Sequence, residues 1–278
     1  MIGGVDGRAG VSSMPPLFGG SISAASLPLD GAGRPAPSAA AVREVVPAER
    51  SELLNRLLNV VVAGLALLIL APVCVVVALL VKLTSPGPVF YTQTRVGVDR
   101  RWRRGEAAAA LPAEVDDDDD DDDDGDRRLE DLGGQPFTIL KFRSMRVDAE
   151  ASGQAVWATK HDSRITPVGH VLRKTRLDEV PQLINVLRGE MNIVGPRPER
   201  PSIVVRLREH VHEYPLRHLV KPGITGWAQI NHSYDACIED VRTKVRYDLE
   251  YIAGQSLWFD LKIMCLTLPV MLFKRGAH

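Results

Sequence analysis

The sequence predicts a mainly helical α+β fold with an N-terminal membrane helix and a small β-hairpin. Three observations lead to this prediction. An uncharged run of 22 residues, Val60–Val81, is long enough for a membrane helix. Two short segments rich in alternating β-forming residues, Val89–Val98 and Phe137–Met145, predict two strands of one small sheet. From Asp162 onward, apolar residues recur with the spacing of helices.

The first 50 residues are predicted to be a disordered tail. They are rich in Gly, Ala, Ser and Pro and show no sustained periodicity. The basic start and early apolar core of a signal peptide are missing from this segment.

Residues 51–84 are predicted to form the membrane helix. No face of the run Val60–Val81 is polar, which disfavours the buried helix of a soluble protein. Pro72 lies near the middle, where proline removes a backbone hydrogen bond and can kink a helix. Two arrangements stay open: the helix spans the bilayer, or it bends at Pro72 and returns to the side it entered.

Residues 100–134 are predicted to be a disordered acidic insert between the two strands. The segment Ala113–Asp131 holds thirteen acidic and two basic residues, including the nine aspartates of Asp116–Asp124. Its charge is −11, so the remainder of the chain carries +10 of the formal total of −1. Such a block repels itself and stays unfolded, and flexible carboxylates bind divalent ions only weakly. The basic remainder indicates anionic partners such as phosphates, nucleotides or acidic lipid.

Helix signals dominate the chain after the second strand. Thr166 and Pro167 form a typical helix start, and the apolar positions that begin at Val180 continue to a stop at Gly189. Further segments are predicted as a helix with a basic face (Ser202–Glu213), a Gly-rich loop (Lys221–Asn231), an amphipathic helix (Glu239–Ile252), and an apolar helix (Ser256–Phe273) with an edge of Trp258, Asp260 and Lys262. That last helix either lies in a membrane interface or packs as a terminal core helix.

Two adjacent carboxylates, Asp178 and Glu179, are the first candidates for chemistry. They stand at or just before a helix start, where Asp is a common N-cap and the helix dipole stabilises its anionic form. For an isolated Leu-Asp-Glu that structural explanation is sufficient. Here, however, three cations stand immediately upstream, Arg173, Lys174 and Arg176. Two more, Lys141 and Arg143, stand in the second predicted strand, so an anionic ligand is expected.

Arg197 is a further candidate, because Pro196 and Pro198 flank it and fix the backbone. A rigidly held arginine can grip a phosphate with two hydrogen bonds. The alternative is an extended connector with a solvent-exposed arginine.

The three cysteines, Cys74, Cys237 and Cys265, show no CxxC spacing. A zinc site or a disulfide framework is therefore not expected, and a reduced cytoplasmic setting fits better.

Four stretches carry a resemblance to a known family. SPGPVFYTQTRVG, PFTILKFRSM, DSRITPVGHVLRKTRLDEVPQLINVLRGEMNIVGPRPERP and KPGITGWAQIN occur in that order. Together they resemble the catalytic domain of the bacterial sugar transferase family, the monotopic phosphoglycosyl transferases, in their short form. The resemblance runs from about Glu52 to Lys274, with the acidic insert between, and defines residues 85–274 as the catalytic domain.

The resemblance implies an activity and a location. The family transfers a sugar-1-phosphate from a nucleotide diphosphate sugar, here expected to be a UDP-sugar, to polyprenyl (undecaprenyl) phosphate. This starts a lipid-linked glycan of the exopolysaccharide, capsule or O-antigen type, and requires Mg²⁺. The family's membrane helix is re-entrant and broken at a proline, which matches Pro72, and its amphipathic helices are interfacial. The expected location is the bacterial inner membrane, with the catalytic domain facing the cytoplasm.

The resemblance also implies residue roles. Asp178 matches the nucleophile, which forms a covalent phosphosugar ester, and Glu179 is expected to help Asp178 hold Mg²⁺. Lys141, Arg143, Arg173 and Arg197 are the predicted phosphate- and substrate-binding residues. Where some members have Asn-Gly-Arg, this chain has Asn-His-Ser at 231–233, so the basic residue that the resemblance implies there is missing. The alternatives are that His232 replaces it or is simply exposed.

This hypothesis has two alternatives. One is an inactive membrane-anchored adaptor whose acidic loop recruits basic partners. The other is a polytopic transferase with a non-covalent mechanism. No nucleic-acid partner is expected, and a homodimer is left open because membrane enzymes of this size often pair.

Overall fold

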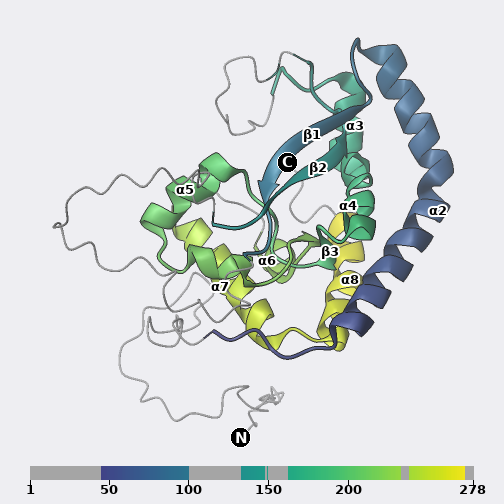
Figure 1. The fold of residues 1–278 in the computed structure, drawn as a ribbon. Coiled ribbons are helices and arrows are strands. Elements are labelled where there is room, and N and C mark those ends of the chain that lie inside the picture. The colour runs from purple at the N-terminus through teal and green to yellow at the C-terminus, as the bar shows by residue number, and fades with distance from the viewer. Residues whose placement is uncertain (1–44, 100–132, 148, 150–161, 233–237, 273–278) are drawn as a thin grey trace, which may run out of the picture. The chain divides into compact units, whose positions relative to one another are not determined.

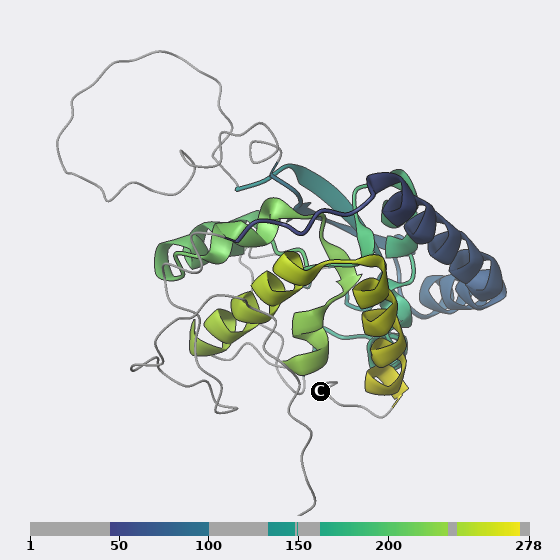
Figure 2. The ribbon, with the colours of Figure 1, turned by 90° about the horizontal axis from the view of Figure 1, so that it is seen from below.

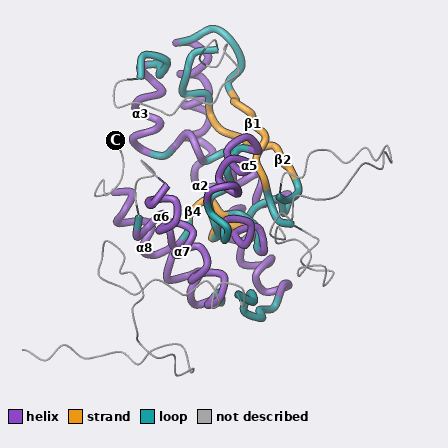
Figure 3. The backbone as a smooth tube through the Cα atoms, turned by 90° about the vertical axis from the view of Figure 1, so that its left-hand side faces the viewer, coloured by secondary structure: helices purple, strands orange, loops and turns teal. Residues whose placement is uncertain are grey.

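The computed structural model describes residues 45–99, 133–147, 149, 162–232 and 238–272, all within one unit of the chain. Most of the predicted tail and of the predicted acidic insert therefore lies outside the described residues. Within the described ranges helices dominate and the strands are short (Figure 3). In chain order the elements are α2 (Glu52–Thr84), β1 (Phe90–Val96), β2 (Pro136–Phe142), α3 (Pro167–Thr175), the 3-10 turn η3 (Leu177–Glu179), α4 (Gln182–Arg188), β3 (Asn192–Val194), α5 (Pro201–His210), the 3-10 turn η4 (Tyr214–Leu219), β4 (Gly223–Thr225), α6 (Trp227–Asn231), α7 (Ile238–Gly254) and α8 (Leu257–Leu272).

Helix α2 confirms the predicted apolar helix and extends it to 33 residues. In the described part of the chain it is the one helix that is long and apolar enough to cross a membrane, by length and composition. Large apolar side chains are exposed along its whole length, from Leu53 to Leu83. Pro72 lies inside α2 without ending it, and the helix is bowed (Figure 1). At about 1.5 Å per residue the helix is about 50 Å long, compared with about 30 Å for a hydrocarbon core.

The N-terminal half of α2 is bound to the rest of the domain through polar side chains. The Arg56 guanidinium donates hydrogen bonds to the backbone carbonyls of Val186 (2.6 Å) and Leu187, in the last turn of α4. Asn59 is buried and its side-chain oxygen accepts from the backbone N–H of Ile193 in β3. Positively charged side chains at the C-terminus of a helix satisfy its unpaired carbonyls, so Arg56 caps α4 from α2.

The C-terminal half of α2 also lies against the domain (Figures 1 and 2). Arg143, just after β2, donates to the carbonyl oxygens of Ser85 (2.8 Å) and Pro86 (2.7 Å), which follow the helix. A small apolar cluster holds the same end in place, made by Val77, Val81, Phe142 and Leu172. One domain thus binds both ends of α2.

Strands β1 and β2 form the predicted two-stranded antiparallel sheet. The register pairs Val96 with Pro136, and the backbone N–H of Gly97 then donates to the carbonyl of Gln135 (2.9 Å). The predicted acidic insert therefore leaves and re-enters the fold at this end of the hairpin.

The connection from α3 to α4 contains a 3-10 turn, η3, that the sequence did not predict. Thr166 caps α3 as predicted, since its hydroxyl accepts from the backbone N–H three residues later (2.9 Å). Arg176 then adopts a left-handed conformation (φ 58°), which ends α3 and starts η3. Consequently α4 begins only at Gln182, and it ends at the predicted glycine, Gly189.

The predicted loop Lys221–Asn231 is wrong, because this segment forms strand β4 and helix α6. Strand β4 pairs in parallel with β3. A Cβ atom at Gly223 would lie 2.1 Å from the backbone nitrogen of Gly195. The glycines that suggested a loop are needed for this close approach of two backbones.

Helices α5, α7 and α8 confirm the three remaining predicted helices. In α8, Trp258 is 81% exposed, as expected for a surface position. Asp260, which was predicted on the same edge, is instead only 2% exposed. It accepts hydrogen bonds from the Tyr251 hydroxyl (2.8 Å) and from Arg50 (3.1 Å), because a buried carboxylate needs such partners.

The main hydrophobic core joins β1, β2 and β3 to α4, α5, α7 and α8. Its fully buried members include Val96, Val186, Met191, Val204, Tyr251, Ile252 and Ile263. This core fixes the strands and turns that carry the polar residues of the candidate site.

Candidate functional site

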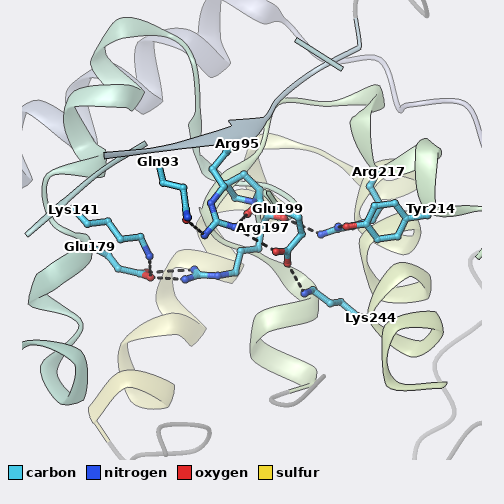
Figure 4. Close-up of polar contacts among 10 residues, drawn as sticks. Gln93, Arg95, Lys141, Glu179, Arg197, Glu199, Tyr214, Arg217 and Lys244 are labelled. Carbon is cyan, nitrogen blue, oxygen red and sulfur yellow. Dashed lines mark hydrogen bonds and ion pairs between the residues drawn. The ribbon is translucent and has the colours of Figure 1, made fainter. Parts of the chain in front are cut away.

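Glu179 lies at the centre of a buried cluster of ion pairs (Figure 4). The Lys141 ammonium is 2.9 Å from Glu179 Oε1. The Arg197 guanidinium pairs with both carboxylate oxygens, with Nη1 3.3 Å from Oε2 and Nη2 bound to Oε1. The structure thus brings together three predicted site residues from β2, from η3 and from the segment between β3 and α5.

The charges of this cluster stabilise one another. Burial alone would raise the pKa of Glu179, but Arg197 and Lys141 bring it well below its usual value. Burial lowers the pKa of Lys141, and Glu179 opposes that change. Glu179 is therefore an anion at physiological pH and serves as a fixed acceptor, not as an acid or base.

Backbone hydrogen bonds hold the segment that carries Arg197. The N–H of Gly195 donates to the carbonyl of Thr225 (2.9 Å), and the N–H of Gly223 donates to the carbonyl of Pro196 (2.9 Å). The Arg217 guanidinium donates to the carbonyl of Arg197 itself (3.0 Å). These bonds add to the effect of the flanking prolines on the backbone.

The sequence did not predict the buried pair of Arg217 and Asp248. Arg217 Nε lies 2.6 Å from Asp248 Oδ2, and both side chains are 2% exposed. Arg217 also donates to the Tyr214 hydroxyl (2.7 Å). A signal was present, since Asp248 stands among the apolar positions of α7, beside Val245 and Leu249, and a buried acid needs a cation.

Glu199 is a second residue that the sequence did not predict. It binds Lys244 (3.0 Å) and Arg95 (3.4 Å), and its backbone carbonyl accepts from the N–H of Val96 (3.0 Å). Burial would raise the pKa of Glu199, but Lys244, Arg217 and Arg95 lower it to about 2. Glu199 thus fixes the end of the Arg197 segment (Figure 4).

Asp178 differs from its neighbour. The side chain is 8% exposed, and its buried Oδ1 atom has no hydrogen-bond partner. Burial and then the charge of Glu179 raise its pKa, against the opposing effect of Lys141, Arg173 and Arg176. The sequence had indicated the opposite direction, from a helix N-terminus, but η3 separates Asp178 from α4 and burial has the larger effect.

Arg173 lies in the last turn of α3 and acts electrostatically on Asp178. Its Nη1 atom is buried and also lacks a hydrogen-bond partner. The site therefore holds an unused carboxylate oxygen and an unused guanidinium donor, an arrangement that suits an anionic group bound between cations.

Arg143 is not brought to this cluster, because its guanidinium is bound to the backbone at the end of α2. Its predicted contact with phosphate stays a prediction. In this structure Arg143 holds the backbone that follows α2. Lys174 and Arg176 are exposed at the end of α3.

The possible metal ligands are few. Among the described residues there is no group of three or more His, Cys, Asp and Glu side chains. Both oxygens of Glu179 accept from cations, whereas Asp178 Oδ1 has no hydrogen-bond partner. The predicted metal roles of Glu179 and Asp178 stay predictions. Mg²⁺ is commonly held by one or two carboxylates together with water and substrate phosphates, so these residues fit a metal that arrives with a phosphorylated substrate.

Comparison with known proteins places the chain. The sequence profile described as "Bacterial sugar transferase" matches residues 50–103 and 127–274. A UDP-glucose:undecaprenyl-phosphate glucose-1-phosphate transferase of Escherichia coli is 42% identical over 230 residues, which cover 82% of this chain and 42% of that protein.

Two further relatives differ in the sugar that their names give. A UDP-N-acetylgalactosamine-undecaprenyl-phosphate N-acetylgalactosaminephosphotransferase of Aeromonas hydrophila is 36% identical over 84% of this chain and 47% of its own length. A UDP-glucose:undecaprenyl-phosphate glucose-1-phosphate transferase of Caulobacter vibrioides is 35% identical over 84% of this chain and 75% of its own length. The chain thus spans less than half of the first two relatives. The residues matched by the family profile include the candidate site. The chain belongs to the bacterial sugar transferase family.

Proposed function

We propose that this protein transfers a sugar-1-phosphate from a UDP-sugar to undecaprenyl phosphate and so starts a lipid-linked glycan, as in exopolysaccharide, capsule or O-antigen synthesis. The names of the relatives support the donor and acceptor classes. The observation that carries the proposal is the pairing of Glu179 with Lys141 and Arg197, beside an Asp178 oxygen that has no partner.

In the first step Asp178 attacks the phosphorus that bears the sugar. A bond forms between its carboxylate oxygen and that phosphorus, the bond to the second phosphate breaks, and UMP leaves with the electron pair. The raised pKa of Asp178 makes its ionised form a more basic nucleophile. Nearby cations, Lys141 and Arg173 among them, favour that ionised form and offset charge on the diphosphate.

In the second step an oxygen of undecaprenyl phosphate attacks the same phosphorus. The Asp178 carboxylate leaves, and the product is a lipid diphosphate sugar. Glu179 holds Lys141 and Arg197 at fixed positions through both steps, so the protein contributes positioning and charge. Mg²⁺, held by Asp178 and substrate oxygens, would offset phosphate charge when bound.

We further infer that α2 enters and leaves the membrane on one side. Arg56, near the start of α2, binds the end of α4. Arg143, which follows β2, binds the backbone just after the other end of α2. A single polar domain cannot bind both ends of a helix whose ends lie on opposite faces of a bilayer. This supports the re-entrant arrangement at the cytoplasmic face of the inner membrane.

The chemical test uses purified protein in detergent with Mg²⁺, undecaprenyl phosphate and a panel of UDP-sugars, read by UMP release. We expect release with at least one sugar, and a phosphosugar adduct on the wild type that Asp178→Asn abolishes. Absence of UMP release with every sugar would exclude the enzyme reading. Full turnover by Asp178→Asn would exclude the covalent mechanism alone.

The membrane arrangement is tested separately by labelling cysteines at the two ends of α2. With the three native cysteines replaced by serine, Glu52→Cys and Thr84→Cys should both react with an impermeant maleimide in inside-out vesicles, and neither in right-side-out vesicles. Opposite sidedness of the two positions would show a spanning helix.

A further inference from the structure

Asn185 makes three side-chain hydrogen bonds that link α4 to strand β2 and to Glu190. It lies in α4, six residues after Glu179, and its side chain is fully buried (0% exposed). Its Oδ1 atom accepts from the backbone N–H of Leu140 (3.1 Å), and its Nδ2 atom donates to the backbone carbonyl of Thr138 (2.7 Å). Nδ2 also donates to Glu190 Oε2 (2.7 Å).

These bonds attach α4 to an edge of strand β2. Backbone groups two residues apart in a strand point the same way, so Thr138 and Leu140 offer a carbonyl and an N–H on one edge. The Asn185 amide pairs with both, as a neighbouring strand would. The reverse orientation of the amide would place its NH₂ group against the Leu140 N–H, so the network fixes which atom is the oxygen.

The residue after this edge is Lys141, whose ammonium binds Glu179. The same two chain segments are thus joined twice: by the Lys141–Glu179 ion pair and by Asn185 to the backbone beside Lys141. We propose that Asn185 is a positioning residue, which fixes β2 on α4 and thereby holds the Lys141 ammonium at the site. The role rests on the proposed function, since it acts through Lys141.

The test compares Asn185→Leu, Lys141→Met, their double variant and Glu179→Gln in the UMP-release assay. Leucine has the same branching and the same number of side-chain heavy atoms as asparagine but makes no side-chain hydrogen bond. We expect Asn185→Leu to lower kcat by about 100-fold, the effect of misplacing a catalytic group by about 1 Å, with a smaller change in KM. In the Lys141→Met background the same change should lower kcat by less than about threefold, because there is no ammonium left to misplace.

Two controls separate positioning from general stability. Val245→Ala, in the core on α7, should lower Tm without the loss in kcat. If Asn185→Leu does not fold, Asn185→Asp combined with Glu190→Gln carries the test, because it keeps an acceptor for Leu140 and avoids two carboxylates in contact. This double change should also lower kcat, and the loss should again be much smaller in the Lys141→Met background than in the wild type.

The outcomes are distinct. Wild-type kcat in the Asn185 variants would overturn this inference. So would a loss in kcat that is as large in the Lys141→Met background as in the wild type. The proposed site would stand in both cases. Wild-type kcat in both Lys141→Met and Glu179→Gln would overturn the proposed site, and this inference with it.

Discussion

The buried pair of Arg217 and Asp248 allows stability and activity to be changed separately. Asp248→Ala leaves the Arg217 charge buried with no carboxylate partner in contact, which typically costs about 3–5 kcal/mol. For a domain of this size each kcal/mol lowers Tm by about 2–4 °C, so we expect a fall of about 6–20 °C. Since both side chains are 2% exposed, solvent cannot replace the lost partner.

The double change Arg217→Met with Asp248→Leu removes both charges. An apolar pair of similar shape should recover most of the lost stability. Activity should not recover, because the carbonyl of Arg197 still lacks the donor that Arg217 supplies at 3.0 Å. We expect kcat to stay about 10- to 100-fold below the wild type.

The assay is UMP release at saturating substrate, with Tm measured by circular dichroism in the same detergent. Recovery of both Tm and kcat in the double variant would refute the reasoning. In that case Arg217 would serve only to neutralise Asp248, and the position of Arg197 would not depend on it.

Three further predictions concern single residues. The pKa of the Glu199 carboxylate is about 2 in the folded protein against 4.5 when unfolded, so its ionised form should add about 3 kcal/mol to the free energy of unfolding above pH 4.5. This contribution is lost as pH falls toward 2. The difference in unfolding free energy between wild type and Glu199→Gln, measured in urea, should therefore be smaller at pH 3 than at pH 7, and an equal difference at both would contradict this. Because burial and Glu179 raise the pKa of Asp178, UMP release should fall with acid at a midpoint above the usual 3.8, and a midpoint at or below that value would count against a buried nucleophile. Thr166→Ala should lower stability by about 1 kcal/mol through loss of the α3 cap, whereas Thr166→Ser should not; equal Tm values for the two would argue against the cap.

Local signals predicted much of the fold. The Thr166 cap, the stop at Gly189 and the apolar run of α2 each depend on a few neighbouring residues, so the sequence alone reveals them. The central residues of the site were also predicted from the sequence, because Glu179, Lys141 and Arg197, which pair in the structure, were all candidates there.

What the sequence could not predict depends on contacts between distant segments. Gly223 indicated a loop because nothing local reveals that another backbone approaches it. Asp248 and Asn185 were overlooked because a polar residue within an apolar helical pattern gives no sign of its partner. The pKa of Asp178 was predicted in the wrong direction because its burial is a property of the folded domain, not of the helix start.

Several supports of Arg197 come later in the chain than Arg197 itself: Arg217, Thr225 and, through Arg217, Asp248. Helix α2, in contrast, is among the first described elements to leave the ribosome, and domains form as their segments emerge. Helix α2 is therefore made long before Arg197 has all of its supports. Because Asp248 in α7 is among these late supports, we expect the Arg197 segment to reach its final position only after α7 has been made.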